Sequence, residues 1–216
     1  MPLIQHHTIE PAGEWGLWKL TELEDYFLEH LDFELGEQAQ YEKMRPSRRL
    51  EWLAVRWLLH QLSGRKVRGK IRKDEYGKPY LVDSDFQISL SHSNGMAAVI
   101  AAPMAVGIDI QLVVEKIERI AHKFMRTEET ESLHPNTRLE HLHVYWGAKE
   151  ALYKAYGRRE LDFRQHIHIR PFEYNVTIGQ CLGYIVKEDF RADYRIFYKK
   201  IDNYILVYCW ELSDNF

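Results

Sequence analysis

The sequence is poor in cysteine and lacks a long hydrophobic run. Only two of its 216 residues are cysteines, Cys181 and Cys209, and they do not have the close spacing of a metal site. Two cysteines in a chain of this length are typical of a reduced, cytoplasmic protein. No apolar stretch approaches the roughly 20 residues that a membrane-spanning helix needs, and the start of the sequence does not resemble a signal peptide. We therefore expect a cytoplasmic protein without a membrane partner.

An excess of charge of one sign is also missing. The net charge is −3, which leaves no surplus of positive charge to neutralise the phosphates of a nucleic acid. A hydrophobic fraction of 45% with 28% charged residues is ordinary for a globular protein. We expect no nucleic-acid partner, while a local basic pocket remains compatible with this composition.

Two long helices stand out because their apolar residues recur every three or four positions. The first covers 47–62, with Ser47 as the expected N-cap and Gly64 after its end. The second covers 139–156 and is closed by Gly157. A third helix is expected over 117–133, and at least one short helix within 15–35. Strands are expected at 67–72, 86–90, 97–102, 105–113, 167–171, 173–178, 183–187, 194–200 and 204–210.

The order of these elements repeats. Each long helix is followed by a hairpin, and 91–95 is the expected connection of the first hairpin. This predicts an α+β fold of two pseudo-repeated halves, each with a helix packed on a small, mostly antiparallel sheet. We place the halves at 1–104 and 105–216 and expect the active site between them. The competing interpretation is that helix and hairpin follow one another twice by chance.

Polar side chains interrupt two apolar elements. Asp109 lies inside the expected strand 105–113, where a lone carboxylate is costly without a partner or a metal. Gln111 points to the same side of that strand. On the second helix, Glu150 and Lys154 share a face with His143 and Gly147. Carboxylates with lysines suit a Mg²⁺-bound pyrophosphate, although Glu150 and Lys154 alone are also compatible with a solvated ion pair.

Further candidates for phosphate binding precede the strand of Asp109. His92 follows a strand in the segment 91–93, and Lys78 follows a tight turn at Gly77. Arginines gather at the start of the first long helix, where the helix dipole favours anions; they are Arg45, Arg48, Arg49 and Arg56. Each of these residues is also compatible with an ordinary solvated surface.

Four motifs occur in the order of a known family. They are YGKP at 76–79, ISLSHS at 88–93, VGID at 106–109 and WGAKEALYK at 146–154. With these motifs the chain resembles the 4′-phosphopantetheinyl transferases, of the larger, monomeric type that activates surfactin synthetase. The resemblance implies two similar α+β halves with coenzyme A bound between them. It also implies transfer of the phosphopantetheine arm of coenzyme A to a serine of an acyl or peptidyl carrier protein, with Mg²⁺ at the pyrophosphate and adenosine 3′,5′-bisphosphate as the other product.

The resemblance implies roles for individual residues. Asp109 and Glu150 match metal ligands, and Glu150 also matches the acceptor of the serine proton. Lys154 matches the lysine that neutralises the leaving pyrophosphate oxygen, and His92 a phosphate-contacting histidine. Gln111 stands where many members have glutamate, so it would offer the metal a neutral amide oxygen and one negative charge less.

The remaining roles concern substrates. The residues that match the coenzyme A pocket are Lys78, Ser91, His92, Arg45, Arg49 and Arg56, with Arg48 as an alternative to Arg49. Residues 119–126 resemble the docking region for an acidic carrier protein, but a snorkelling basic surface helix has the same pattern. A non-catalytic binder of coenzyme A or of carrier proteins is the alternative function, favoured only by Gln111. A purely structural α+β protein would leave Asp109 unexplained.

Overall fold

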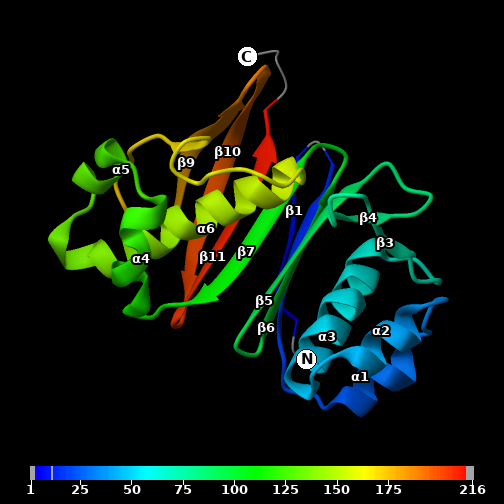
Figure 1. Cartoon of the computed structure of the whole chain (residues 1–216). Helices are drawn as coiled ribbons and strands as arrows, with labels where there is room; N and C mark the ends of the chain where they lie inside the picture. Colours follow the sequence, from blue (N-terminus) through cyan, green and yellow to red (C-terminus); the bar gives the residue numbers. More distant parts are fainter. Residues whose placement is uncertain (1–2, 11, 213–216) are drawn as a thin grey trace.

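The computed structural model describes residues 3–10 and 12–212, which form two antiparallel sheets and their covering helices (Figure 1). The first sheet has the spatial order β1-β2-β6-β5-β4-β3. Its strands are β1 (Leu3–Thr8), β2 (Glu14–Lys19), β3 (Ile71–Lys73), β4 (Pro79–Leu81), β5 (Gln87–Ser93) and β6 (Met96–Ala102). The second sheet has the order β7-β11-β10-β9-β8. Its strands are β7 (Val106–Leu112), β8 (Ile167–Ile169), β9 (Ile178–Lys187), β10 (Phe190–Ile201) and β11 (Tyr204–Glu211).

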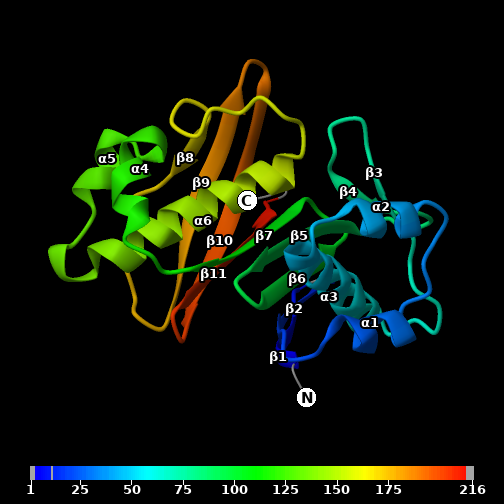
Figure 2. The same cartoon turned by 60° about the horizontal axis from the view of Figure 1, so that its bottom comes forward.

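The helices are distributed between the two sheets. Those of the first half are α1 (Glu24–His30), α2 (Glu37–Lys43) and α3 (Pro46–Ser63). Those of the second half are α4 (Lys116–Phe124), α5 (Thr127–Glu131), the short 3₁₀ helix η1 (Pro135–Thr137) and α6 (Arg138–Tyr156). In Figure 2, α3 lies across the first sheet and α6 across the second. The predicted α+β class is confirmed.

The predicted repeat is visible in the strand order. The five strands β2-β6-β5-β4-β3 correspond one by one to β7-β11-β10-β9-β8. In the chain, α3 separates β2 from β3, and α6 separates β7 from β8. The two halves therefore have the same connectivity, and β1 is an addition to the first.

Three hydrophobic clusters hold these layers together. In the first half, Leu53 and Leu58 of α3 pack on the sheet. In the second, Tyr145 and Leu152 of α6 do the same. The third cluster lies between the two sheets and takes residues from both, among them Leu17, Ile100, Ile108 and Leu206. Because this cluster spans both halves, neither half buries its apolar surface alone.

The two sheets also meet along β5 and β7 through serine hydroxyls. The Ser89 hydroxyl accepts a hydrogen bond from the backbone N–H of Ile108 at 3.1 Å, and the Ser91 hydroxyl accepts one from Ile110 at 3.2 Å. Side chains therefore take the place that carbonyl groups have between paired strands. We call this contact the serine seam. It fixes β7, and with it Asp109, against the first half.

Several predicted boundaries were wrong for local reasons. The first long helix begins at Pro46 with Arg45 as N-cap, since proline fits the first helical position. Strand β5 continues through Ser93, because Asn94 and Gly95 form a two-residue turn with φ of 43° and 83°. The predicted connection 91–95 was therefore wrong, and His92 lies within a strand. The expected helix 117–133 is interrupted before Thr127, where α5 begins.

The predicted bounds of other strands also differ from those in the structure. Strand β3 covers only part of the expected 67–72, and 173–178 forms no strand before Ile178. Strands β1, β2 and β4 were not predicted.

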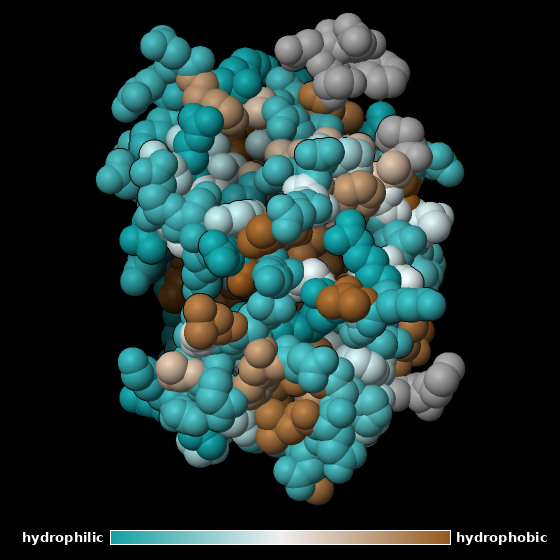
Figure 3. Space-filling view, turned by 90° about the vertical axis from the view of Figure 1, so that its right-hand side faces the viewer, coloured by the Kyte–Doolittle hydropathy of each residue, from teal (hydrophilic) through white to brown (hydrophobic). Residues whose placement is uncertain are grey.

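Among the helices of the described residues, none combines the length and apolar character required to cross a bilayer. Figure 3 shows the surface of the first half, where hydrophilic side chains surround smaller hydrophobic areas.

Candidate active site

Strand β7 and helix α6 pack closely together because two glycines, which lack a Cβ atom, lie in the contact between them. A Cβ atom at Gly107 would collide with the backbone carbonyl of Ala151, and one at Gly147 would lie 2.8 Å from the side-chain nitrogen of Gln111. Any larger residue at these positions would push α6 away from the sheet. This close approach brings the polar face of α6 onto Asp109.

Asp109 is the centre of the polar contacts. Its side chain accepts hydrogen bonds from Lys154 Nζ at 2.7 Å and from the Ser91 hydroxyl at 2.9 Å, both at Oδ1. Its Oδ2 accepts a longer one from Gln111 Nε2 at 3.3 Å. The residue is only 8% exposed. A carboxylate in an apolar strand needs a partner, and for Asp109 this partner is Lys154. Lys154 also donates a hydrogen bond to the Ile108 carbonyl at 2.9 Å.

Glu150 lies one helical turn before Lys154. Burial raises the pKa of its carboxyl, the charge of Asp109 acts in the same direction, and Lys154 opposes both. None of the described side chains donates a hydrogen bond to the Glu150 carboxylate. A half-buried carboxylate with free oxygens beside a second carboxylate is suited to bind a cation or to accept a proton.

Gln111 is held in a fixed orientation by His143. Its amide oxygen lies 2.9 Å from His143 Nδ1, and its amide nitrogen donates to the His143 carbonyl at 3.0 Å. His143 Nε2 accepts a hydrogen bond from the N–H of Val114 at 3.0 Å. Since burial lowers the pKa of His143, the ring is neutral. Its Nδ1 therefore carries the proton and donates it to Gln111.

The donor set fits a magnesium ion with two protein carboxylates. Asp109 and Glu150 place carboxylate oxygens, which are hard donors, on neighbouring elements, and Mg²⁺ is commonly bound by one or two carboxylates plus water and phosphate oxygens. Within residues 3–10 and 12–212, no cluster of three or more His, Cys, Asp or Glu side chains is arranged to hold a metal. Gln111 would therefore have to supply any third side-chain ligand, in competition with the hydrogen bond from His143.

His92 joins the site from the first half. Its Nδ1 lies 2.8 Å from a carboxylate oxygen of Glu51 on α3. Burial lowers the pKa of His92; Glu51 opposes this, and the nearby charges of Arg48 and Lys154 add to it. The charge of Lys154 reaches His92, and Ser91 bonds Asp109, so side chains of both halves lie close together here.

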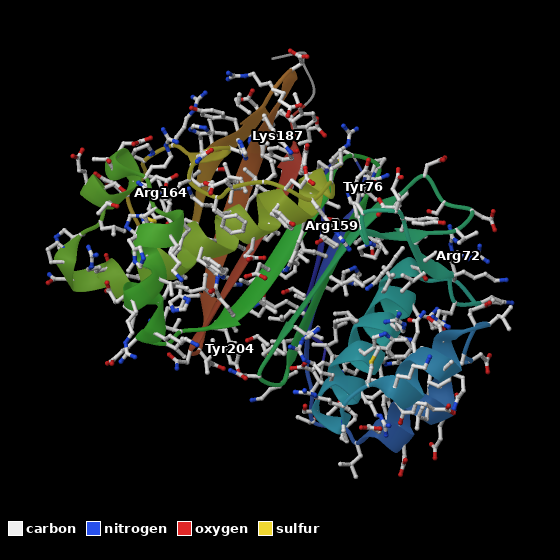
Figure 4. The ribbon with its side chains drawn as sticks, in the orientation of Figure 1. Arg72, Tyr76, Arg159, Arg164, Lys187 and Tyr204 are labelled. Atoms are coloured by element: carbon white, nitrogen blue, oxygen red, sulfur yellow. The ribbon has the colours of Figure 1, made fainter. Side chains whose placement is uncertain are left out.

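A cavity of about 210 Å³ lies beside this site, between the halves. From the first half, it is lined by 76–79 and 88–90, and from the second by Tyr153, Lys154, Gly157 and Arg159. Lys78 Nζ donates to the Ala155 carbonyl at 2.7 Å, in the last turn of α6, where carbonyls favour a cation. Arg159 donates to the Tyr76 carbonyl at 2.6 Å, and Figure 4 shows these two residues next to each other. Ser91 does not line this cavity.

Comparison with known proteins agrees with this two-part arrangement. The family model of the 4′-phosphopantetheinyl transferase superfamily matches residues 105–209, and that of the 4′-phosphopantetheinyl transferase N-terminal domain matches residues 36–102. The chain belongs to the 4′-phosphopantetheinyl transferase superfamily. It is also 32% identical over 111 residues to "4′-phosphopantetheinyl transferase gsp" from Aneurinibacillus migulanus. That match covers 50% of this chain and 46% of the relative, so it spans about half the length of each protein.

In this member of the superfamily, the four arginines of α3 do not form one cluster. Arg49 donates to the carbonyls of Met44 and Glu42 and lies over the Tyr41 ring. Arg56 is paired with Glu37 at 2.9 Å and lies over the Trp52 ring. Arg45 is the N-cap of α3.

Arg48 is the arginine whose charge reaches His92. It is therefore better placed than Arg56 to meet a ligand at the site.

The first lysine of the motif 146–154, Lys149, lies on a different face of α6 from the site. Lys149 is 0% exposed and forms an ion pair with Glu129 of α5 at 2.9 Å. It also donates to the carbonyls of Phe163 and Ile167. The ammonium group of Lys149 is therefore fully used inside the second half and does not contribute to the site. No local sequence signal pointed to Glu129 as its partner.

The segment 119–126 forms most of α4. Phe124 and Met125 are buried against α6, whereas His122 and Lys123 are exposed. Arg126 pairs with Glu128 at 2.6 Å. The segment is thus amphipathic, with a basic outer face beside the apolar one.

Proposed function

We propose that this chain transfers the 4′-phosphopantetheine arm of coenzyme A to a serine hydroxyl of an acyl or peptidyl carrier protein. The observation that carries the proposal is the convergence of Asp109, Glu150 and Lys154 with His92 from the other half. These are the residue types needed to hold a metal-bound pyrophosphate, and membership of the superfamily supports this reaction class.

In the proposed reaction, Asp109 and Glu150 would hold Mg²⁺, which would supply positive charge beside the pyrophosphate of coenzyme A. Gln111 is the third proposed member of that metal site. Glu150 accepts the proton of the carrier serine, for which its raised pKa is suited. The serine oxygen forms a bond to the phosphorus of the phosphopantetheine arm, and the bond to the other phosphate breaks. Adenosine 3′,5′-bisphosphate leaves with the bonding electron pair, while Lys154 and His92 offset its growing negative charge.

We further propose that the two halves have different roles. Residues 1–104 bind the adenosine and phosphate part of coenzyme A through Lys78, Ser91 and His92, and Arg45, Arg48 and Arg49 at the start of α3 bind the 3′-phosphate. Residues 105–216 supply the metal site and the carrier-docking surface.

The amphipathic segment 119–126 supports docking of an acidic carrier protein. One chain supplies both walls of the cavity, which favours a monomer. Two free, buried cysteines favour the cytoplasm.

The test is incubation of an apo carrier protein with the enzyme, coenzyme A and Mg²⁺, followed by mass spectrometry. We expect a mass gain of one phosphopantetheine arm, and no gain when a chelator removes Mg²⁺. Calorimetric titration with coenzyme A runs in parallel. Binding of coenzyme A without any mass gain across several carrier proteins would instead support the non-catalytic alternative, which Gln111 favours.

A further inference from the structure

A second cavity lies in the first half, toward the C-terminal end of α3. Its volume is about 360 Å³, at the lower end of the roughly 300–1,000 Å³ typical of small-molecule pockets. Its walls come from α3, the strands β3, β4 and β6, and the loops beside them. It shares no lining residue with the cavity between the halves. The two cavities are therefore separate places in the fold.

Most of the wall of this second cavity is apolar. Leu59 and Leu62 come from α3, Ile71 and Leu81 come from the β3–β4 hairpin, and Phe86 precedes β5. Phe86 is 38% exposed and so lies where the cavity meets solvent. An apolar surface of this kind is suited to a hydrocarbon chain.

The other end of the cavity is positively charged. Arg56 and Arg68 both line it, and both bind the same carboxylate, that of Glu37. Their side chains are 9% and 8% exposed. One negative charge therefore faces two buried positive charges, and the charges of the other two charged lining residues, Arg65 and Glu14, offset each other. Such an imbalance is costly unless a further anion approaches, and the crowding by Arg68 adds to burial in lowering the pKa of Arg56 to about 10.

Two polar atoms at this end lack a partner. Arg68 Nε and His60 Nδ1 are buried and have no hydrogen-bond partner among the described residues. Both residues line the cavity. Buried polar atoms in native structures are nearly always paired, so Arg68 and His60, which both belong to the cavity wall, retain unused hydrogen-bonding capacity.

We propose that this cavity binds a small amphiphilic carboxylate of the medium-chain fatty-acid class. Its carboxylate would lie at Arg56, Arg68 and His60, and its chain would follow the apolar wall toward Phe86. A carboxylate accepts charge-assisted hydrogen bonds and carries one negative charge, which equals the excess of Arg56 and Arg68 over Glu37. A phosphate monoester would bring nearly two negative charges and overcompensate it.

The first test is isothermal titration of the full chain with sodium octanoate. We expect saturable binding at one site per chain, at least tenfold weaker binding of butyrate because its chain is shorter, and no binding of octan-1-ol because it lacks the charge. Saturation with coenzyme A should leave the octanoate affinity unchanged. Equal binding of octanol and octanoate, absence of octanoate binding, or displacement by coenzyme A would each overturn the proposal.

Three variants sharpen this test. Arg68→Met should weaken octanoate binding at least tenfold, since it removes a charge-assisted hydrogen bond. Leu81→Gln alters the apolar wall and leaves the ion pairs with Glu37 in place, so it remains informative if the first variant folds poorly; we expect a several-fold loss. Arg72→Met is the matched control, because Arg72 is exposed on the same hairpin and does not line the cavity (Figure 4). Equal octanoate affinity in all three variants and the parent would refute the site.

Discussion

At the scale of single residues, neighbours give two carboxylates of the same site different properties. Asp109 is satisfied by Lys154, Ser91 and Gln111. Glu150 receives no such donors, and burial raises its pKa. The carboxylate of Asp109 is thus held by hydrogen bonds within the folded chain, whereas the carboxylate of Glu150 keeps its oxygens free for a ligand or a proton.

This difference predicts different stability effects for two variants that both lose activity. Asp109→Asn and Glu150→Gln should each lower the transfer rate by about 100-fold or more, because both remove a proposed metal ligand. Asp109→Asn should also lower the melting temperature, since Lys154 loses its charged partner. Glu150→Gln should leave it unchanged or raise it. Glu173→Gln, at an exposed position, serves as the control in both assays. Near-parent transfer by either site variant would contradict the assignment.

Gln111→Glu tests the position where the chain departs from many relatives. The new carboxylate would face Asp109 Oδ2 and the His143 carbonyl, where the amide now donates. We expect a lower melting temperature without metal, and a larger rise of that temperature on adding Mg²⁺ than in the parent. The Mg²⁺ concentration for half-maximal transfer should fall. Superimposable Mg²⁺ titrations of the two proteins would place Gln111 outside the metal site.

His141 gives a pH dependence that is independent of the site. The ring is 1% exposed, both of its nitrogens lack a hydrogen-bond partner among the described residues, and burial lowers its pKa from 6.5 to about 4. The unfolded chain therefore binds a proton at a higher pH than the folded one. The contribution of this residue to stability is complete above pH 6.5 and is lost as the pH falls toward 4.

From this linkage, the parent should lose up to about 3 kcal/mol of unfolding free energy between pH 6.5 and pH 4 through His141. His141→Phe keeps the ring contacts with Tyr145 and Phe172 and should remove that part of the pH dependence. Urea unfolding at several pH values measures it, with the exposed His122→Gln as control. Parallel curves for the parent and His141→Phe would disprove the role of this ring.

At the scale of elements, the ion pair of Lys149 and Glu129 fixes α6 to its surroundings. Glu129 also accepts hydrogen bonds from the N–H groups of Ile169 and Arg126. The pair therefore ties α6, α5 and β8 together from the side of α6 that faces away from the candidate active site. Its function is to hold the helix that carries Glu150 and Lys154.

Lys149→Met should destabilise the protein by about 3–5 kcal/mol, because it leaves the Glu129 carboxylate buried and unpaired, and should lower the melting temperature by roughly 10 °C. The double variant Lys149→Met/Glu129→Gln should lose less than the sum of the single variants. Lys123→Met, an exposed lysine of α4, is the control. Strictly additive losses would show that the two side chains are not coupled.

The sequence predicted those elements whose signals are local. Helices α3 and α6 have long apolar stripes and end at glycines with positive φ, Gly64 and Gly157. Strand β7 was recognised from its apolar run. Strand β2 was missed because its pairing with β6 joins residues about 80 positions apart, which no local pattern records.

The same distinction applies to the site. Asp109, Glu150 and Lys154 lie together as the spacing on α6 and β7 indicated. The bond between His143 and Gln111 was not predicted, although His143 was placed on the correct face of the helix. Its partner depends on how α6 is positioned along the sheet, which the close contact at Gly107 decides.

At the scale of the whole molecule, the cluster between the sheets makes the halves interdependent. Ile108 and Leu206 of the second half pack against Leu17 and Ile100 of the first. We expect thermal unfolding as a single cooperative transition, with equal calorimetric and van't Hoff enthalpies. Separate fragments 1–104 and 105–216 should not show sharp transitions of their own. Two resolved transitions in the intact chain would contradict this.

The arrangement of the outer strands bears on how the protein behaves when it is concentrated. On one side, β1 covers the edge of β2, and the serine seam covers the edge of β7. On the other side, the sheets end in β3 and β8, which have three residues each. A long, free strand edge is where a second chain adds itself to a sheet. The seam therefore removes the long edge of β7 from this risk, whereas β1, with six residues, remains a free outer edge, and we expect edge-to-edge association of the concentrated protein to involve β1.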